Sequence, residues 1–144
     1  MVKVHTIEML EHSSRSTPNV KAHTNMINGS LVGLGDGVTI APADGKKLYI
    51  VMNVQNGDKE YADSYEIAKD TYVNLYDVSS WDGKELDITS ANLVGDYVAI
   101  NVGDTLTFDA DTFKFTAGTG TIKFTVTNKF GTIANGLRVK IEVA

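Results

Sequence analysis

A strict alternation of apolar and polar residues over residues 137–143 is the feature that most constrains the fold of this chain. Four apolar side chains, at Leu137, Val139, Ile141 and Val143, alternate there with charged ones. Successive side chains of a β-strand point to opposite faces of the sheet, whereas a helix would scatter these residues around its axis. The segment therefore predicts a strand with one face in a hydrophobic core and the other in water.

Similar patterns recur along the chain and predict a mainly β protein. The sequence contains 15 Val, 15 Thr and 10 Ile, which are β-branched residues that pack well on a pleated surface. Glycine-containing turns separate the runs, as in an antiparallel β-sandwich or a small β-barrel. We expect about seven or eight short strands, including residues 37–40, 47–54, 72–76, 97–102, 105–108, 113–115, 121–127 and 137–143, of which 47–54 is apolar enough to be buried on both faces.

At most one short helix is expected, over residues 58–70. Tyr61, Tyr65 and Ala68 fall there at helical spacing, and Asp58 stands near the position of an N-cap. The stretch 34–38 carries glycines on both sides of Asp36 and predicts a turn rather than a phosphate-binding loop, because it lacks the lysine and hydroxyl residues of such loops.

The chain of 144 residues has the length of one domain. We expect an extended N-terminal arm over residues 1–28 and a β domain over residues 29–144, because residues 11–19 are polar and contain a proline. Fully extended, the arm would reach on the order of 90 Å, enough to cross a neighbouring subunit. The residues expected to bind a partner are Val2, Val4, Met9, Leu10, Arg15, Val20 and Lys21.

Charge and composition exclude several classes of partner. The formal net charge of −5 disfavours a nucleic-acid backbone, and no apolar run is long enough to span a bilayer, so neither nucleic acid nor a membrane is expected as a partner. The chain has no cysteine, which excludes disulfides and thiolate metal sites. The opening residues lack the pattern of a signal peptide, so we expect synthesis and assembly in a cytoplasm.

No pattern of catalytic residues stands out, and we expect no enzymatic activity, no cofactor and no resident metal. His5, His12 and His23 have separations of 7 and 11, which match neither a helical nor a strand pair of metal ligands. Asp104, Asp109 and Asp111 leave two interpretations open, a calcium-binding loop and ordinary turn aspartates. A small enzyme is the weakest of the functional hypotheses, because it needs a pocket with converging titratable groups.

A cluster of aromatic residues offers an alternative function. Trp81 stands in a loop-like stretch, and Tyr61 and Tyr65 precede it, so together they would form a surface site that stacks on a sugar or a protein partner. This favours a carbohydrate- or host-surface-binding β-sandwich module. The other interpretation places Trp81 in the interior, closing the end of the β domain.

Four segments together resemble a family of small structural proteins from tailed-phage virions, described as capsid decoration or head fibre proteins. They are Asn28-Gly-Ser-Leu-Val-Gly-Leu34, Leu48-Tyr-Ile-Val51, Gly95-Asp-Tyr-Val98 and the closing strand Arg138-Val-Lys-Ile-Glu-Val143. The resemblance covers about residues 25–144 and leaves the arm unmatched.

The resemblance implies a protein bound to the outer surface of an icosahedral capsid. Its partner would be the major capsid protein, and its location the virion, after assembly in the bacterial cytoplasm. It further implies a homo-oligomer, with a trimer favoured among the possible states. Decoration, or the base of a head fibre, fits better than adhesion, because the sequence shows no long repetitive shaft.

Overall fold

The computed structural model describes residues 3–4, 20–52, 66–130 and 136–143. These residues form antiparallel sheets, with three short 3-10 helices among the connections. Of the twelve strands among the described residues, against the seven or eight expected, eight have three residues or more. These are β3 (Leu31–Leu34), β5 (Tyr49–Val51), β7 (Leu75–Asp77), β8 (Glu85–Thr89), β9 (Thr105–Phe108), β10 (Phe115–Ala117), β11 (Ile122–Phe130) and β12 (Gly136–Val143).

The remaining described elements are short. Two-residue strands occur at β1 (Lys3–Val4), β2 (Met26–Ile27), β4 (Thr39–Ile40) and β6 (Glu66–Ile67). The 3-10 helices are η2 (Val78–Trp81), η3 (Ser90–Asn92) and η4 (Tyr97–Ala99).

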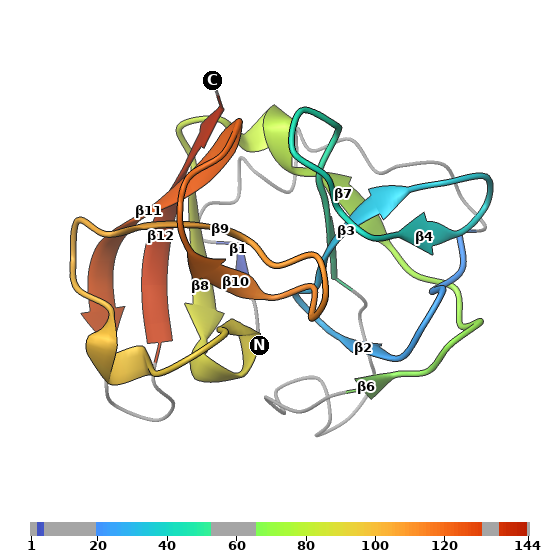
Figure 1. Cartoon of the computed structure of the whole chain (residues 1–144), viewed down its shortest axis with the longest axis horizontal. Coiled ribbons are helices and arrows are strands. Elements are labelled where there is room, and N and C mark those ends of the chain that lie inside the picture. The colour runs from blue at the N-terminus through green and yellow to red at the C-terminus, as the bar shows by residue number, and fades with distance from the viewer. Residues whose placement is uncertain (1–2, 5–19, 53–65, 131–135, 144) are drawn as a thin grey trace.

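The larger sheet has six strands in the order β1-β8-β12-β11-β9-β10, and the second has four in the order β4-β3-β5-β7 (Figure 1). Both sheets are open, so the fold is a sandwich and not a closed barrel. The alternation over residues 137–143 has the predicted result: Leu137, Val139 and Ile141 are buried in β12, whereas Lys140 is exposed. β11 and β12 form the longest ladder, with a bulge between Val126 and Asn128.

The main hydrophobic core lies between the two sheets. Leu31, Ile50 and Tyr76 of the four-stranded sheet belong to the same buried cluster as Phe124 and Val139 of the six-stranded sheet. This contact between the inner faces confirms the predicted sandwich.

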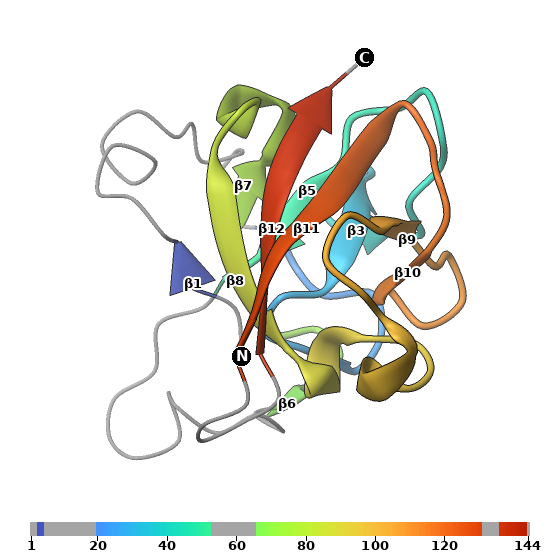
Figure 2. The same cartoon turned by 90° about the vertical axis from the view of Figure 1, so that its left-hand side faces the viewer.

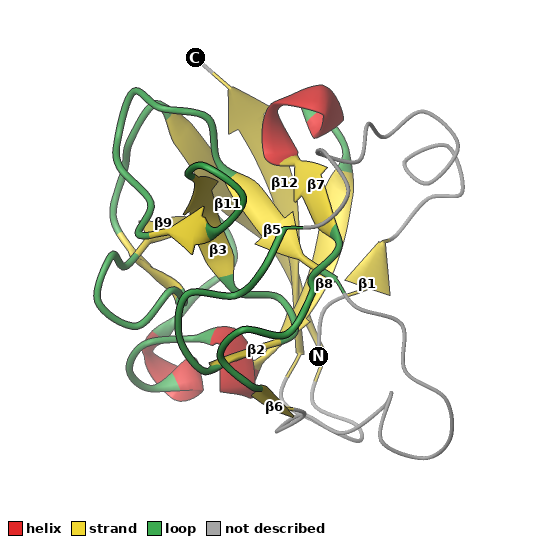
Figure 3. Ribbon diagram, turned by 90° about the vertical axis from the view of Figure 1, so that its right-hand side faces the viewer, coloured by secondary structure: helices red, strands yellow, loops and turns green. Residues whose placement is uncertain are grey.

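A second core covers the opposite face of the four-stranded sheet. Val32, Tyr49 and Val51 pack there against residues that precede the sheet in sequence, among them Val20 and Ala22. All three residues of β5 are buried, which confirms burial on both faces for this part of the expected segment 47–54. Lys47 is exposed, and residues 53–54 lie outside the described residues. The strand pair β2-β6 (Figure 3) contributes Met26 and Ile67 to this second core.

The second core corrects the expected boundary of the arm. Val20, Ala22 and Met26 are buried, so the chain from residue 20 onwards belongs to the folded body. Residues 5–19 of the expected arm lie outside the described residues.

Three predictions of local structure need correction. The strand expected over 97–102 is wrong: its first residues form the 3-10 helix η4, whose turn the Asp96 carboxylate caps by accepting from Val98 N at 3.0 Å, and residues 100–102 are not in a strand. The expected helix over 58–70 is wrong where it is described, because Glu66–Ile67 is strand β6. The strand expected at 113–115 is displaced to β10, because Phe113 has a φ of 62°.

Candidate functional site

Trp81 does not belong to a surface aromatic site. Its side chain is only 1% exposed, and it stacks on Tyr76 with ring centroids 5.6 Å apart and an interplanar angle of 27°. The turn that places it begins at Asp77, whose carboxylate accepts from Ser79 N at 3.0 Å. Tyr61 and Tyr65 lie outside the described residues. The carbohydrate-binding hypothesis thereby loses the residue on which it mainly depended.

Two residues expected to bind a partner are part of the body instead. Val20 is buried, and the backbone of Lys21 donates to Gly37 O at 3.1 Å and accepts from Thr39 N at 2.9 Å. The Lys21 ammonium lies 5.2 Å from the centroid of the Tyr72 ring. These contacts tie Val20 and Lys21 to two other parts of the chain, so both residues belong to the folded body.

The other expected arm residues have different positions. Val4 belongs to β1, where it pairs with Leu86 of β8. Val2, Met9, Leu10 and Arg15 lie outside the described residues.

His23 is hydrogen-bonded to Thr39 through both its ring and its backbone. Its Nδ1 lies 2.6 Å from Thr39 Oγ1, and its backbone N donates to the same oxygen at 3.1 Å. The Thr39 hydroxyl has one hydrogen, so it can donate to an unprotonated Nδ1 while accepting from the backbone. Burial lowers the pKa of His23, because desolvation disfavours the charged ring. The geometry therefore fits a neutral imidazole.

The aspartates weighed as calcium ligands have turn-capping roles where their bonds are described. Asp104 accepts from Asn101 N at 2.9 Å, and Asp109 accepts from both the backbone N and the hydroxyl of Thr112. Within the described ranges, no three His, Asp or Glu residues gather closely enough to hold a metal ion.

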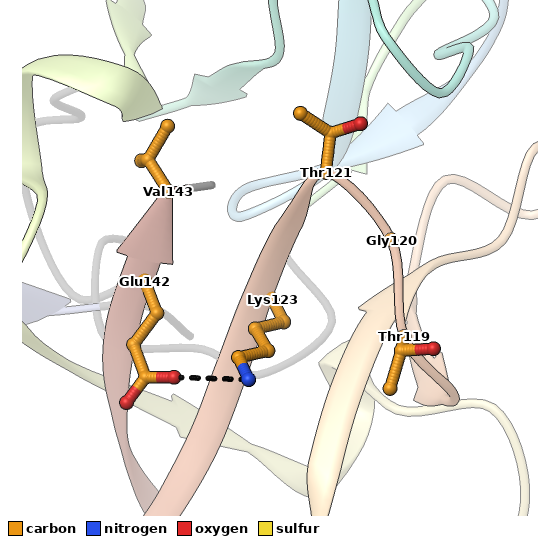
Figure 4. Close-up of a pocket in the computed structure, with 6 residues that line it drawn as sticks. All are labelled: Thr119, Gly120, Thr121, Lys123, Glu142 and Val143. Atoms are coloured by element: carbon orange, nitrogen blue, oxygen red, sulfur yellow. Dashed lines mark ion pairs between the residues drawn. The ribbon is translucent and has the colours of Figure 1, made fainter.

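A shallow pocket of about 370 Å³ opens beside the strand ends of β11 and β12 (Figure 4). Its charged residues, Lys123 and Glu142, form an ion pair at 3.4 Å, and both side chains are well exposed. Beside it, Asp44 accepts from Thr121 N at 2.7 Å, and this hydrogen bond lowers the pKa of Asp44. The pocket is lined by Thr119, Gly120, Thr121, Lys123, Glu142 and Val143. The ionisable side chains among them, Lys123 and Glu142, are exposed to water, so the pocket holds no buried titratable group for acid-base chemistry.

Three exposed valines lie within nine residues of sequence near η4, and we call residues 94–102 the valine segment. Val98 is 74% exposed, Val102 59% and Val94 39%. Single exposed apolar residues are normal on a protein surface. Here three fall in one short segment, with Val98 in the turn of η4 and Val102 in the following turn, which Asp104 N closes by donating to Asn101 O at 3.0 Å. The valine segment is therefore the strongest candidate for an interaction site among the described residues.

The valine segment is held by contacts to β11 and β12. The Tyr97 hydroxyl lies 3.1 Å from Phe130 O and 3.2 Å from Gly136 O, either of which accepts its proton. The Lys129 ammonium donates to Ile100 O at 2.6 Å and to Tyr97 O at 3.3 Å. Since these groups anchor the backbone on both sides of Val98, its side chain is presented on a preformed surface.

The helix η3, which precedes the valine segment in the chain, is joined to the turn at Asn28. Asn92 Nδ2 donates to Asn28 O at 2.9 Å, and Ser30 Oγ closes the same turn by donating to Ile27 O at 2.7 Å. This hydrogen bond joins the segment 28–34, which carries part of the resemblance to phage proteins, to η3, and the segment 95–98 follows η3 in the chain. The sequence pattern did not reveal this site, because the alternation in residues 97–102 predicts a strand. The available signal was Asp96, a residue type that caps helical turns, which stands between Gly95 and the turn at Gly103.

A second set of exposed apolar residues lies near β4. Ile40 and Tyr72 are exposed, and the Ile40 side chain packs on Gly33 and Gly35. A Cβ at Gly35 would lie 2.9 Å from Ile40 Cγ2, so the glycine leaves room for the isoleucine. This surface serves as a matched control for the valine segment in the experiments below.

Comparison with protein-family models, curated proteins and solved structures finds no significant match to this chain. Among the described residues, none of the helices has the length and apolar character needed to cross a bilayer.

Proposed function

We propose that this chain is a virion structural protein of a tailed bacteriophage that binds the outer surface of the capsid as a decoration protein or head fibre base. The observation that carries the proposal is the exposure of Val98, on a turn fixed by Tyr97 and Lys129, and of Val102 in the turn that follows. The sequence resemblance to phage capsid decoration proteins supplies the partner, the major capsid protein.

A fixed apolar turn suits attachment to a protein lattice. Burying a valine side chain contributes about 1.5–3 kcal/mol at most, so the valine segment alone gives modest affinity per site. Because the turn is already ordered, little conformational entropy is lost on binding. A capsid repeats the same site many times, and an oligomer that engages several sites at once gains avidity.

The arm adds a second attachment element in this proposal. Since Val20 and Lys21 belong to the body, the part of the arm proposed to contact the capsid or a neighbouring subunit is restricted to residues 1–19. Of the expected contact residues, this retains Val2, Val4, Met9, Leu10 and Arg15.

Co-sedimentation with assembled capsids tests the valine segment directly. The Val98→Ser/Val102→Ser variant replaces two exposed side chains, so we expect it to fold normally and to bind at least about tenfold more weakly, which corresponds to about 1.4 kcal/mol. The matched control is Val38→Ser/Ile40→Ser, which changes exposed apolar residues near β4. Equal capsid binding by both variants and the unaltered protein would contradict the role of the valine segment.

A truncation tests the arm separately. Removal of residues 1–19 leaves both hydrophobic clusters intact, since their described members begin at Val20. We expect this variant to fold and to occupy fewer capsid sites at the same concentration. Unchanged occupancy would limit the attachment surface to the body.

A further inference from the structure

The two edges of β8 are paired unequally. Along its inner edge, all five residues of β8 have partners on β12, from Glu85 opposite Lys140 to Thr89 opposite Gly136. Along its outer edge, the described pairing consists of two residues of β1: Lys3 opposite Asp87 and Val4 opposite Leu86. Figure 2 shows β1 as the outermost strand, beside β8.

The backbone groups on the outer edge follow from the ladder. Ile141 N donates to Lys84 O at 2.9 Å, so the backbone of Lys84 is directed towards β12. Backbone direction alternates along an antiparallel strand, and the backbone groups of Glu85 and Asp87 are therefore directed outwards, towards β1. At the end of β8, Thr89 N donates to Asn92 Oδ1 at 3.3 Å, which limits the outer edge to a short segment centred on Asp87.

The sequences of the two strands are complementary. Residues 2–5 read Val-Lys-Val-His and alternate apolar with basic residues, whereas residues 85–88 read Glu-Leu-Asp-Ile and alternate acidic with apolar ones. The register places the basic residue Lys3 opposite the acidic Asp87 and the apolar Val4 opposite the apolar Leu86. The Asp87 carboxylate accepts from Arg138 Nε at 2.9 Å, so the match between the two strands lies in their sequence pattern and register.

We propose that the outer edge of β8 is the docking site for the N-terminal strand of a second copy of this chain, in a strand-exchanged homo-oligomer. The pairing of β1 with β8 of its own chain is then the closed form of the same contact. This inference does not rest on capsid binding.

The length of the connecting chain allows the exchange. Residues 5–19 separate β1 from Val20, and 15 residues span up to about 50 Å when extended. A domain of this size has a radius of gyration of about 15 Å, so the strand can reach the β8 edge of an adjacent copy.

The closed contact is small enough to open, and high protein concentration then favours exchange. A hydrogen bond contributes a net of about 0.5–1.5 kcal/mol, and two residues in register form few of them. Exchange makes the same contacts between copies, so it loses no pairing energy, and the balance depends on protein concentration.

Cysteine cross-linking tests the proposal, and the chain offers a background free of cysteine. Residues directly opposite each other in a hydrogen-bonded antiparallel pair have Cα atoms about 5.5 Å apart, within the range of a disulfide. Lys3→Cys protein is mixed with Asp87→Cys protein and oxidised, and the covalent products are separated without reductant and identified by mass. A disulfide between the two variants requires pairing between copies.

The matched control mixes Lys3→Cys with Lys123→Cys, because Lys123 is a partly exposed residue of β11 opposite Glu142 and not of β8. We expect the mixed Lys3–Asp87 dimer to exceed the control dimer at least about tenfold, by the effective concentration of paired strands. Equal yields in the two mixtures would overturn the proposal.

A double variant gives an independent readout. Lys3→Cys/Asp87→Cys should form an internal disulfide in dilute solution and covalent oligomers in concentrated solution, with a trimer indicating a closed ring and a dimer a reciprocal exchange. Internal disulfides alone at every concentration would also overturn the proposal. Both results are obtained without capsids, so they are distinguishable from a failure of the Val98→Ser/Val102→Ser test.

Discussion

The Lys129 ammonium lies 4.4 Å from the centroid of the Tyr97 ring and donates to Ile100 O at 2.6 Å. The Lys129 side chain of β11 therefore contacts both the aromatic ring of Tyr97 in η4 and the backbone at the end of η4. The exposed Val98 is displayed on a turn that is itself bound to the longest ladder of the protein.

Replacing Lys129 with methionine should destabilise the protein and loosen the valine segment. The change keeps an unbranched side chain of similar length but removes the charged hydrogen bonds to Tyr97 O and Ile100 O and the contact of the ammonium with the Tyr97 ring. We therefore expect a loss of about 2 kcal/mol in the free energy of unfolding. Urea denaturation measures it. The control Lys123→Met removes only an exposed ion pair and should change stability by less than about 1 kcal/mol; equal losses would contradict the role of Lys129.

Trp81→Ala should destabilise the core strongly. The side chain is buried and stacked on Tyr76, and truncating a buried tryptophan costs about 3–5 kcal/mol. Guanidinium denaturation followed by circular dichroism gives the loss, and Tyr72→Ala, at a more exposed aromatic residue, should cost much less.

Trp81 is the only tryptophan of the chain, so its fluorescence should shift to longer wavelength when the unaltered protein unfolds. A red-shifted spectrum in the native state would contradict its burial.

Stability should decrease as the pH falls through the ordinary pKa of histidine. Desolvation lowers the pKa of His23 in the folded chain below 6.5, so the unfolded chain takes up the proton first. The contribution of His23 to stability is therefore fully present above about pH 6.5, decreases below it, and levels off below the folded pKa. Urea midpoints between about pH 5 and 8 measure the slope, which His23→Gln should reduce. An identical slope in both proteins would contradict this environment.

Two truncations should separate the arm from the body. Removing residues 1–19 should leave the thermal unfolding transition cooperative, whereas removing residues 1–25 deletes Val20 and Ala22. It also deletes backbone bonds such as Ala22 N to Thr71 O, so we expect the longer truncation to lose about 3 kcal/mol or more. Similar melting temperatures for the two variants would place the boundary further along the chain.

The fold class follows from the sequence because side-chain alternation records a sheet with one buried face. β11 and β12 show the pattern clearly, and β5 shows the continuous apolar run of a strand between two cores. β8 was not anticipated, because Glu85 and Asp87 are poor strand formers although Leu86 and Ile88 face the core. Its strand conformation depends on pairing with β12, which is a long-range contact.

The candidate site was not predictable from the same pattern. In residues 97–102 the alternation of Val98, Ile100 and Val102 resembles that of a strand, yet Ile100 is buried and the two valines are exposed. The deciding interactions come from Phe130, Gly136 and Lys129, far away in sequence. Loop composition likewise leaves two interpretations of Trp81 open, a surface site and a residue that closes the end of the β domain, because it does not show which way a side chain points. The structure has Trp81 buried.

The position of β12 has a consequence for biosynthesis. β12 follows every other described strand in the chain, yet it lies between β8 and β11 in the larger sheet. While the nascent chain emerges from the ribosome, β8 and β11 have facing edges with no strand between them until residues 136–143 appear. Exposed strand edges are templates for aggregation. The chain is therefore most prone to aggregate during synthesis, before residues 136–143 pair with β8 and β11.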